Sequence, residues 1–356
     1  MASTSGRSRV VSSAVQKGET SPTSRGAIDV HHHHGSPELM SFMASHASDR
    51  VIPVNDWRVE EAIADMDASG VETAILSQFT PYHSGTAAER QMVTRSVNDI
   101  GARHAHDHRG RFGLFTSLPL PSIEDSLAEI AYGLDVLGAD GVCMVSSVDN
   151  KWLGHPFFWP IYEELDRRRA VVYVHPYTPG CCTCLVPEIP EYIIEYATDT
   201  TRTIGSLIWS GTTTRFPNIR FIFSHGGGTM PFLIERFLAG TSAEVVPGIV
   251  TKGKSPPFVP KQPPAGVLAE IRKMYFDTAQ CSNPIALRAL RDVALSPQIV
   301  YGSDYWFRTN AETMRGINSC NVFSEAELTA VKHGNAEAMF GAWPGSRIKA
   351  PGASTG

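Results

Sequence analysis

Long apolar runs are absent from this sequence of 356 residues. None approaches the roughly 18 residues that a membrane-spanning helix needs, so we do not expect an integral membrane protein. Residues 1–24 also lack the apolar core of a secretory signal and are rich in Ser and Thr, so they are expected to form a disordered tail. Because this stretch carries Arg7, Arg9 and several serines, a transit peptide is the alternative interpretation.

A strong excess of charge of either sign is absent too. The formal net charge is −5, and Lys and Arg form no basic stripe, so a nucleic acid is not an expected partner. The six cysteines are not spaced as a disulfide framework, and Cys181, Cys182 and Cys184 are crowded into one segment. We therefore expect a reduced, cytoplasmic protein whose partner is a small molecule.

Eight segments rich in β-branched and aromatic residues, each closed by turn residues, predict β-strands. They are 27–32, 72–77, 112–117, 141–146, 171–175, 219–224, 273–278 and 298–303. Segments of helical periodicity lie between them, at 57–69, 87–108, 123–137, 157–169, 192–215, 230–239 and 284–294. Strand and helix therefore alternate along the chain.

This alternation, within a single domain over residues 25–345, is typical of a (β/α)8 TIM barrel, although a doubly wound open sheet has the same local pattern. The two differ in where chemically useful side chains fall, because a barrel gathers the carboxyl ends of all its strands around one mouth. The segments 33–56, 177–191 and 240–266 are expected to be loops over that mouth. Residues 346–356 are small and polar, and we expect them to fray.

Two histidines at the end of the first predicted strand are candidate metal ligands. Residues 27–30 run directly into four consecutive histidines, His31 to His34. Because alternate side chains share one face of a strand, His31 and His33 point together while His32 points away. A remnant of a purification tag is the alternative, but tags are usually longer and do not follow a strand-like segment.

Three other predicted strands end in similar side chains, which are His175, His225 and Asp304. Each histidine alone is more often a structural residue. Four strand ends that carry His or Asp, however, coincide with the place where barrel enzymes hold their catalytic groups. Imidazole and carboxylate ligands suit zinc, manganese or iron. The pattern favours a divalent metal at the mouth, with Zn²⁺ as the first choice and Mn²⁺ as an alternative.

Four motifs at these strand ends form a specific set. They are Asp29-Val30-His31-His32-His33, Val174-His175-Pro176, Ser224-His225-Gly226-Gly227-Gly228 and Gly302-Ser303-Asp304-Tyr305. Together they resemble the signatures of the amidohydrolase-related decarboxylases within the amidohydrolase superfamily. That family includes aminocarboxymuconate semialdehyde, γ-resorcylate and 6-methylsalicylate decarboxylases. The resemblance covers about residues 27–341 and implies a metal-dependent barrel.

The resemblance implies a set of four metal ligands, His31, His33, His175 and Asp304. It implies that His225 is an acid/base that hydrogen-bonds a metal-bound water, and that Asp304 takes part in catalysis. Arg236 would contact a substrate carboxylate, in a homodimer or larger oligomer. Relatives with two metals carry a lysine or glutamate at the end of the fourth strand, and residues 143–146 offer no such group. One metal is therefore predicted.

The expected activity is the nonoxidative decarboxylation of a hydroxylated, salicylate-like aromatic acid. The metal would orient the carboxylate and an ortho-hydroxyl, while Asp304 or a water held by His225 protonates the ring carbon. Hydrolysis of a lactone or amide, and hydration of an unsaturated acid, are alternatives on the same site. A metal-binding protein without activity is the non-enzyme alternative. Aromatic residues expected to form a slot for the ring are Phe79, Tyr82, Trp152, Trp209, Trp306 and Phe307.

Two features depart from the family pattern and leave the substrate open. His155 stands where relatives often carry an acidic residue, and the segment 181–184, with its three cysteines, is unfamiliar. These cysteines could bind a metal, but a thiolate site needs a fourth ligand. Ordinary loop cysteines are therefore the favoured interpretation.

Overall fold

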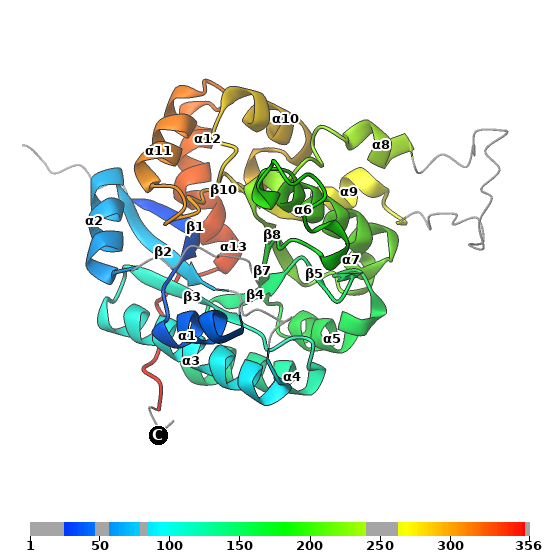
Figure 1. Ribbon diagram of the computed structural model, residues 1–356. Helices are drawn as coiled ribbons and strands as arrows, with labels where there is room; N and C mark the ends of the chain where they lie inside the picture. Colours follow the sequence, from blue (N-terminus) through cyan, green and yellow to red (C-terminus); the bar gives the residue numbers. More distant parts are fainter. Residues whose placement is uncertain (1–24, 47–56, 79–84, 240–262, 353–356) are drawn as a thin grey trace, which may run out of the picture.

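Eight parallel strands form the centre of the molecule (Figure 1). The computed structural model describes residues 25–46, 57–78, 85–239 and 263–352. The strands are β1 (Ala27–His33), β2 (Val71–Ser77), β3 (Phe112–Ser117), β4 (Gly141–Val145), β7 (Val171–His175), β8 (Arg220–Phe223), β9 (Tyr275–Asp277) and β10 (Ile299–Val300). Each pairs in parallel with the next in this order. The eight predicted strands are confirmed, with small differences in their bounds.

Backbone hydrogen bonds join the two ends of this sheet. The Val30 N–H donates to the Tyr301 carbonyl over 3.0 Å, and the Asp304 N–H donates to the His31 carbonyl over 2.9 Å. The residues that follow β10 therefore lie along β1, and helices surround the strands (Figure 1). An open doubly wound sheet would leave its first and last strands unpaired. The fold is a (β/α)8 barrel, as predicted.

The helices lie outside the strands and cover the barrel. They are α1 (Pro37–His46), α2 (Val59–Ser69), α3 (Ala87–Asp107), α4 (Ile123–Ala131), α5 (Trp159–Arg167), α6 (Glu191–Trp209), α7 (Thr212–Arg215), α8 (Ile234–Ala239), α9 (Val267–Ile271), α10 (Pro284–Ala294), α11 (Asn310–Ser319), α12 (Glu325–Thr329) and α13 (Asn335–Phe340). A short antiparallel pair, β5 (Ser147–Val148) and β6 (Lys151–Trp152), follows β4. Capping boxes begin α3, α11 and α12, where a Thr or Ser side chain and a Glu three residues later satisfy the first backbone N–H groups.

Some predicted helices differ from the observed ones for local reasons. The prediction of one helix over 192–215 is wrong because Gly211 adopts a left-handed φ of +77°, which separates α6 from α7. The segment predicted as a helix over 123–137 is α-helical only to Ala131 and continues as a π-helix through Leu137. The segment 230–239 is helical only from Ile234.

The three expected loops have different outcomes. The prediction of a loop over 33–56 is wrong for its first half, because α1 lies there and buries Leu39 and Phe42. The segment 177–191 is irregular, apart from a 3₁₀ turn at Gly180–Cys182, until α6 begins. Most of the third expected loop, residues 240–262, lies outside the described residues, as do 47–56.

The strands β3, β4 and β7 are buried along their whole length, which fits their largely apolar composition. Tyr173, two residues before His175 on β7, is fully buried, and its ring stacks on Phe115 with centroids 5.5 Å apart. The same ring lies 5.3 Å from that of His31. Tyr173 therefore packs between the interior of the barrel and the strand-end histidines.

The two ends of the chain differ. Residues 1–24 lie outside the described residues. Within the segment expected to fray, Ile348 is only 3% exposed, and the Lys349 N–H donates to the Leu137 carbonyl over 2.9 Å. The packed structure thus continues beyond residue 345.

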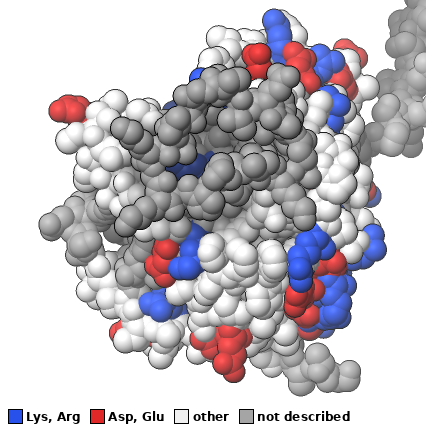
Figure 2. All heavy atoms as spheres, turned by 90° about the vertical axis from the view of Figure 1, so that its right-hand side faces the viewer, with Lys and Arg blue, Asp and Glu red and all other residues white. Residues whose placement is uncertain are grey.

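On the face that Figure 2 presents, basic and acidic side chains lie next to one another at several places. Among the described helices, none is long and apolar enough to cross a bilayer.

Candidate metal centre

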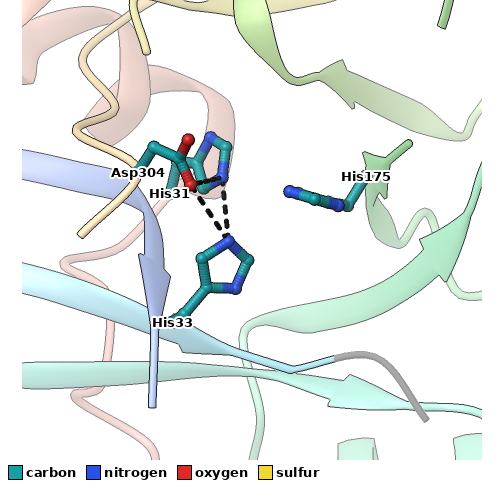
Figure 3. A group of neighbouring side chains, drawn as sticks. All are labelled: His31, His33, His175 and Asp304. Carbon is teal, nitrogen blue, oxygen red and sulfur yellow. Dashed lines mark hydrogen bonds and ion pairs between the residues drawn. The ribbon is translucent and has the colours of Figure 1, made fainter. Parts of the chain in front are cut away.

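Four side chains from three segments of the barrel converge at one point. His31 and His33 come from β1, His175 ends β7, and Asp304 follows β10. One nitrogen or oxygen of each lies within 4.8 Å of those of the other three, and all four residues are buried. Figure 3 shows His31, His33 and Asp304 close together, with His175 facing them from the other side. These are the four residues expected to bind the metal.

The shortest contacts within the group involve one carboxylate oxygen. Asp304 Oδ1 lies 3.1 Å from His31 Nε2 and 3.2 Å from His33 Nε2. The two Nε2 atoms are themselves 3.2 Å apart. These three atoms face one another and would be available together as ligands of one cation.

Neighbouring groups orient two of the imidazoles. The Nδ1 of His31 lies 2.8 Å from Asp277 Oδ2 at the end of β9, and the Nδ1 of His175 lies 2.8 Å from the Pro176 carbonyl. An acceptor at Nδ1 places the proton there and leaves Nε2 with its lone pair, which is the form of histidine that binds a metal. His32 is outside the group: its Nδ1 contacts Asp29 at 3.1 Å.

The second oxygen of Asp304 has its own partners. His225 Nε2 lies 3.3 Å from Asp304 Oδ2, and the side-chain amide of Gln280 donates to the same oxygen over 2.5 Å. The backbone N–H of His225 donates to Asp277 Oδ1 over 2.8 Å. His225, whose role the strand pattern alone leaves undecided, is therefore adjacent to the group and contacts Asp304.

Burial and charge act on these groups in opposite directions. Burial alone would lower the pKa of His31, but the carboxylates of Asp304 and Asp277 raise it to about 10. Burial lowers the pKa of His33, and burial together with the neighbouring imidazoles holds the pKa of His175 well below its usual range. Burial would raise the pKa of Asp304, yet the charge of His31 and the contact with His225 hold it well below its usual range. Neutral His33 and His175 and an ionised Asp304 are the forms that bind metals, whereas His31, charged beside two carboxylates, would have to release its Nε2 proton to do so.

The donor set fits a divalent metal. Three imidazoles and one carboxylate, buried within a short distance of one another, match the ligands of zinc and manganese and offer too few oxygens for calcium. In the described part of the chain, no other cluster of three or more potential ligands is found. The cysteines of the segment 181–184 are free thiols outside it, and Cys181 Sγ lies 2.9 Å from Cys182 Sγ.

Aromatic rings flank the group on two sides. The rings of Trp306 and Phe307 lie 6.3 and 5.7 Å from that of His33. The ring of Tyr196, on α6, lies 6.2 Å from that of His175. Of the other rings expected in a substrate slot, Phe79 and Tyr82 lie outside the described residues.

Three further residues are expected to contact substrate. Two of them, Trp152 and Trp209, contact other side chains, and the third, Arg236, lies on the surface. The indole N–H of Trp152 donates to Asp199 Oδ1 over 2.6 Å, and the ring of Trp209 packs 4.9 Å from that of Phe237. Arg236 is exposed on α8. Their contact with substrate stays a prediction.

Three residues near the group are not predicted from the sequence. Asp277 is a carboxylate at the end of a buried strand, so the rule that selects Asp304 would also have selected it. Gln280 and Tyr196 lie in a loop and on a helix, and no motif distinguishes them. Only their three-dimensional contacts identify them.

Comparisons with known proteins agree with this fold and site. A family model described as amidohydrolase matches residues 28–342. Decarboxylase yanB of Aspergillus niger is 32% identical over 296 residues, which are 78% of this chain and 76% of that protein. The 6-methylsalicylic acid decarboxylase of Penicillium expansum is 30% identical over 320 residues, 85% of this chain and 91% of that protein.

A solved structure shares the fold at low identity. The 5-carboxyvanillate decarboxylase of Novosphingobium aromaticivorans, in complex with manganese and 4-hydroxy-3-methoxy-5-nitrobenzoic acid, is 19% identical with a TM-score of 0.76, over 88% of this chain and 96% of that one. The chain belongs to the amidohydrolase family. Both curated relatives described above are decarboxylases.

Proposed function

We propose that this protein is a metal-dependent carboxy-lyase that removes CO₂ from a hydroxylated, salicylate-like aromatic acid without an oxidant. The observation that carries the proposal is the buried group of three histidines and Asp304 at the strand ends. The type of reaction is supported by relatives at 30–32% identity that are named as decarboxylases, one of them of 6-methylsalicylic acid. Their coverage extends over most of this chain.

The residues that would hold one divalent metal are His31, His33, His175 and Asp304. Bound there, the cation would orient the carboxylate and an ortho-hydroxyl and stabilise phenolate charge. Zn²⁺ is our first choice for three imidazoles and a carboxylate. Mn²⁺ is the alternative, supported by the manganese in the solved 5-carboxyvanillate decarboxylase.

Direct loss of CO₂ would leave an unstable carbanion in the plane of the ring. A proton must therefore add first to the ring carbon that bears the carboxylate. The C–C bond then breaks, its electron pair restores the aromatic ring, and CO₂ leaves. His225 Nε2 and Asp304 Oδ2, 3.3 Å apart, are suited to hold this proton between them and to deliver it directly or through a water.

An apolar slot beside the metal would bind the ring. Trp306 and Phe307, beside His33, and Tyr196, beside His175, are the rings that would line it. Within the described residues the indole N–H of Trp306 is buried without a hydrogen-bond partner, which supports a role as donor to a substrate oxygen. Trp152, Trp209 and Arg236 are kept as more distant candidates.

Two further assignments are proposals of the same kind. A homodimer or larger oligomer, in which Arg236 of one subunit approaches the site of another, is supported by the exposure of this residue on α8. A reduced, cytoplasmic setting is supported by the six cysteines, all of which are free thiols.

The test is to incubate the Zn²⁺-loaded and Mn²⁺-loaded protein with a panel of ortho-hydroxybenzoates, and in parallel with lactones, amides and unsaturated acids. We expect CO₂ release and loss of ring absorbance with at least one benzoate. His175→Ala should lose both bound metal and turnover, whereas His106→Ala, which removes an imidazole from α3, should lose neither. Turnover confined to lactones or amides would refute the decarboxylase and favour the hydrolase.

A further inference from the structure

Three side chains that meet at one oxygen all come from residues with a left-handed backbone. Asp304, whose Oδ2 is that oxygen, has a φ of +67°. His225 and Gln280, which contact it, have φ values of +53° and +52°. A left-handed conformation is unfavourable for residues other than glycine, and such residues persist where the surroundings hold them, often at functional sites.

Gln280 is the least expected of the three. Asp and His are several-fold enriched in the left-handed region, but Gln is not. Gln280 is exposed, so burial of an apolar side chain does not explain its conformation. In the described part of the chain, the hydrogen bond found for its side chain is the one to Asp304. We therefore attribute the left-handed backbone of Gln280 to the hydrogen bond between its side chain and the Asp304 carboxylate.

The two oxygens of Asp304 face in different directions. Oδ1 lies 3.1 and 3.2 Å from His31 Nε2 and His33 Nε2, while Oδ2 faces His225 and Gln280. Rotation of the carboxylate would exchange these oxygens. Two donors on Oδ2 oppose that rotation and keep Oδ1 directed at the histidine nitrogens.

The two donors differ in their chemistry. Unlike an imidazole, a carboxamide neither takes up nor releases a proton and is a fixed donor. Gln280 can therefore hold the carboxylate in position but cannot transfer a proton. Asp277, three residues earlier in the same segment, contacts His31 Nδ1 at 2.8 Å. The segment 277–280 thus touches two of the four candidate ligands.

We propose that Gln280 is a positioning residue that fixes the orientation of Asp304 for metal binding. The kinetic part of its test rests on the proposed function. The proposed effect of Gln280 on metal binding does not depend on which reaction the protein catalyses.

The test measures Zn²⁺ affinity by competition with a chelator. Gln280→Met keeps the length of the side chain and removes the amide donor. Loss of a group that orients a metal ligand typically weakens metal binding by about tenfold to a hundredfold, and we expect an effect in that range. The matched control is Gln91→Met, the same change at an exposed glutamine of α3, which should leave the affinity unchanged.

A second variant separates positioning from folding. Gln280→Gly removes the side chain but suits a positive φ, so the melting temperature of the metal-free protein should not fall while Zn²⁺ affinity falls as in Gln280→Met. Unchanged Zn²⁺ affinity in both variants would overturn the proposal.

Kinetics with an active benzoate give an independent measurement. In Zn²⁺-saturated Gln280→Met, kcat should fall while KM changes little, and Gln280→Asn should recover part of kcat because it retains an amide. A rise in KM with unchanged kcat and unchanged metal affinity would make Gln280 a substrate contact instead. If no substrate is found, the proposed function fails, but the affinity measurement still decides the role of Gln280.

Discussion

Asp277 connects two parts of the candidate site. Its Oδ2 contacts His31 Nδ1 at 2.8 Å, and its Oδ1 accepts the backbone N–H groups of His225 and Ala279 at 2.8 and 3.0 Å. A buried carboxylate with these partners fixes the ring of one candidate ligand and the backbone of the candidate acid/base.

We expect Asp277→Asn to weaken Zn²⁺ binding by about tenfold to a hundredfold, because a neutral amide accepts more weakly from His31 and can present its own N–H instead. Chelator competition measures this change. Asp292→Asn, at an exposed position of α10, is the matched control and should bind Zn²⁺ normally. Normal affinity in the Asp277 variant would show that His31 does not depend on this carboxylate.

At the scale of single residues, the sequence predicts side chains that follow a strand and fails for those that do not. His31, His33, His175 and Asp304 are found because the end of a buried strand fixes where the next side chain lies. Gln280 reaches the same group through a loop with a left-handed backbone, which no local pattern specifies.

The helix α6 supports the segment that follows β4 through one buried carboxylate. Asp199 accepts hydrogen bonds from the hydroxyls of Ser146 and Ser147 and from the indole of Trp152. Burial raises the pKa of Asp199, while these three hydrogen bonds act to lower it. The helix therefore attaches the β5–β6 pair to the barrel by satisfying three donors at one residue.

Removal of this carboxylate should destabilise the protein. Asp199→Ala leaves three donors without their acceptor, and we expect a loss of about 3 kcal/mol in the free energy of unfolding. Asp199→Asn, which keeps one oxygen, should lose less. Urea unfolding measures both, with Asp292→Ala on the surface of α10 as the control. A loss no greater than that of the control would mean that the segment 146–152 is held by other contacts.

At the scale of elements, helices with sustained periodicity are predicted and short ones are not. The periodicity of the segment 87–108 identifies α3 almost to its ends. By contrast, α1 offers only Leu39 and Phe42 as buried positions, too few to form a periodic signal. The boundary at Gly211 follows from a single positive φ within a longer amphipathic segment.

A bound metal would connect strands that are distant in the chain but neighbours in the barrel. The candidate ligands come from β1, β7 and the segment after β10, so a cation held by them links the two ends of the sheet and its far side. Binding to the folded state alone adds stability that grows with the metal concentration.

Zn²⁺ at about 100 times its dissociation constant should add about 2.7 kcal/mol to the free energy of unfolding. Calorimetry should then show a melting temperature higher by a few degrees, and a chelator should reverse the rise. His175→Ala should show no such rise. Equal melting temperatures of the native protein with and without Zn²⁺ would contradict a buried site formed by these four residues.

For the whole molecule, the strand count and the alternation are local properties that the sequence predicts. Closure is not local, because it depends on hydrogen bonds such as that from Val30 to Tyr301. The His and Asp residues at the strand ends distinguish a closed barrel from an open sheet. Side chains from distant strands are expected to meet only where the strand ends surround a common mouth.

The closure of the barrel between β1 and the segment after β10 also determines when, during synthesis of the chain, the candidate site can form. His31 and His33 lie on the first described strand and are translated long before Asp304, which follows the last strand. A nascent chain that stops before Asp304 lacks the candidate carboxylate ligand and the backbone that pairs with His31. If the four candidate ligands bind a metal together, we expect its capture to follow synthesis of the last strand.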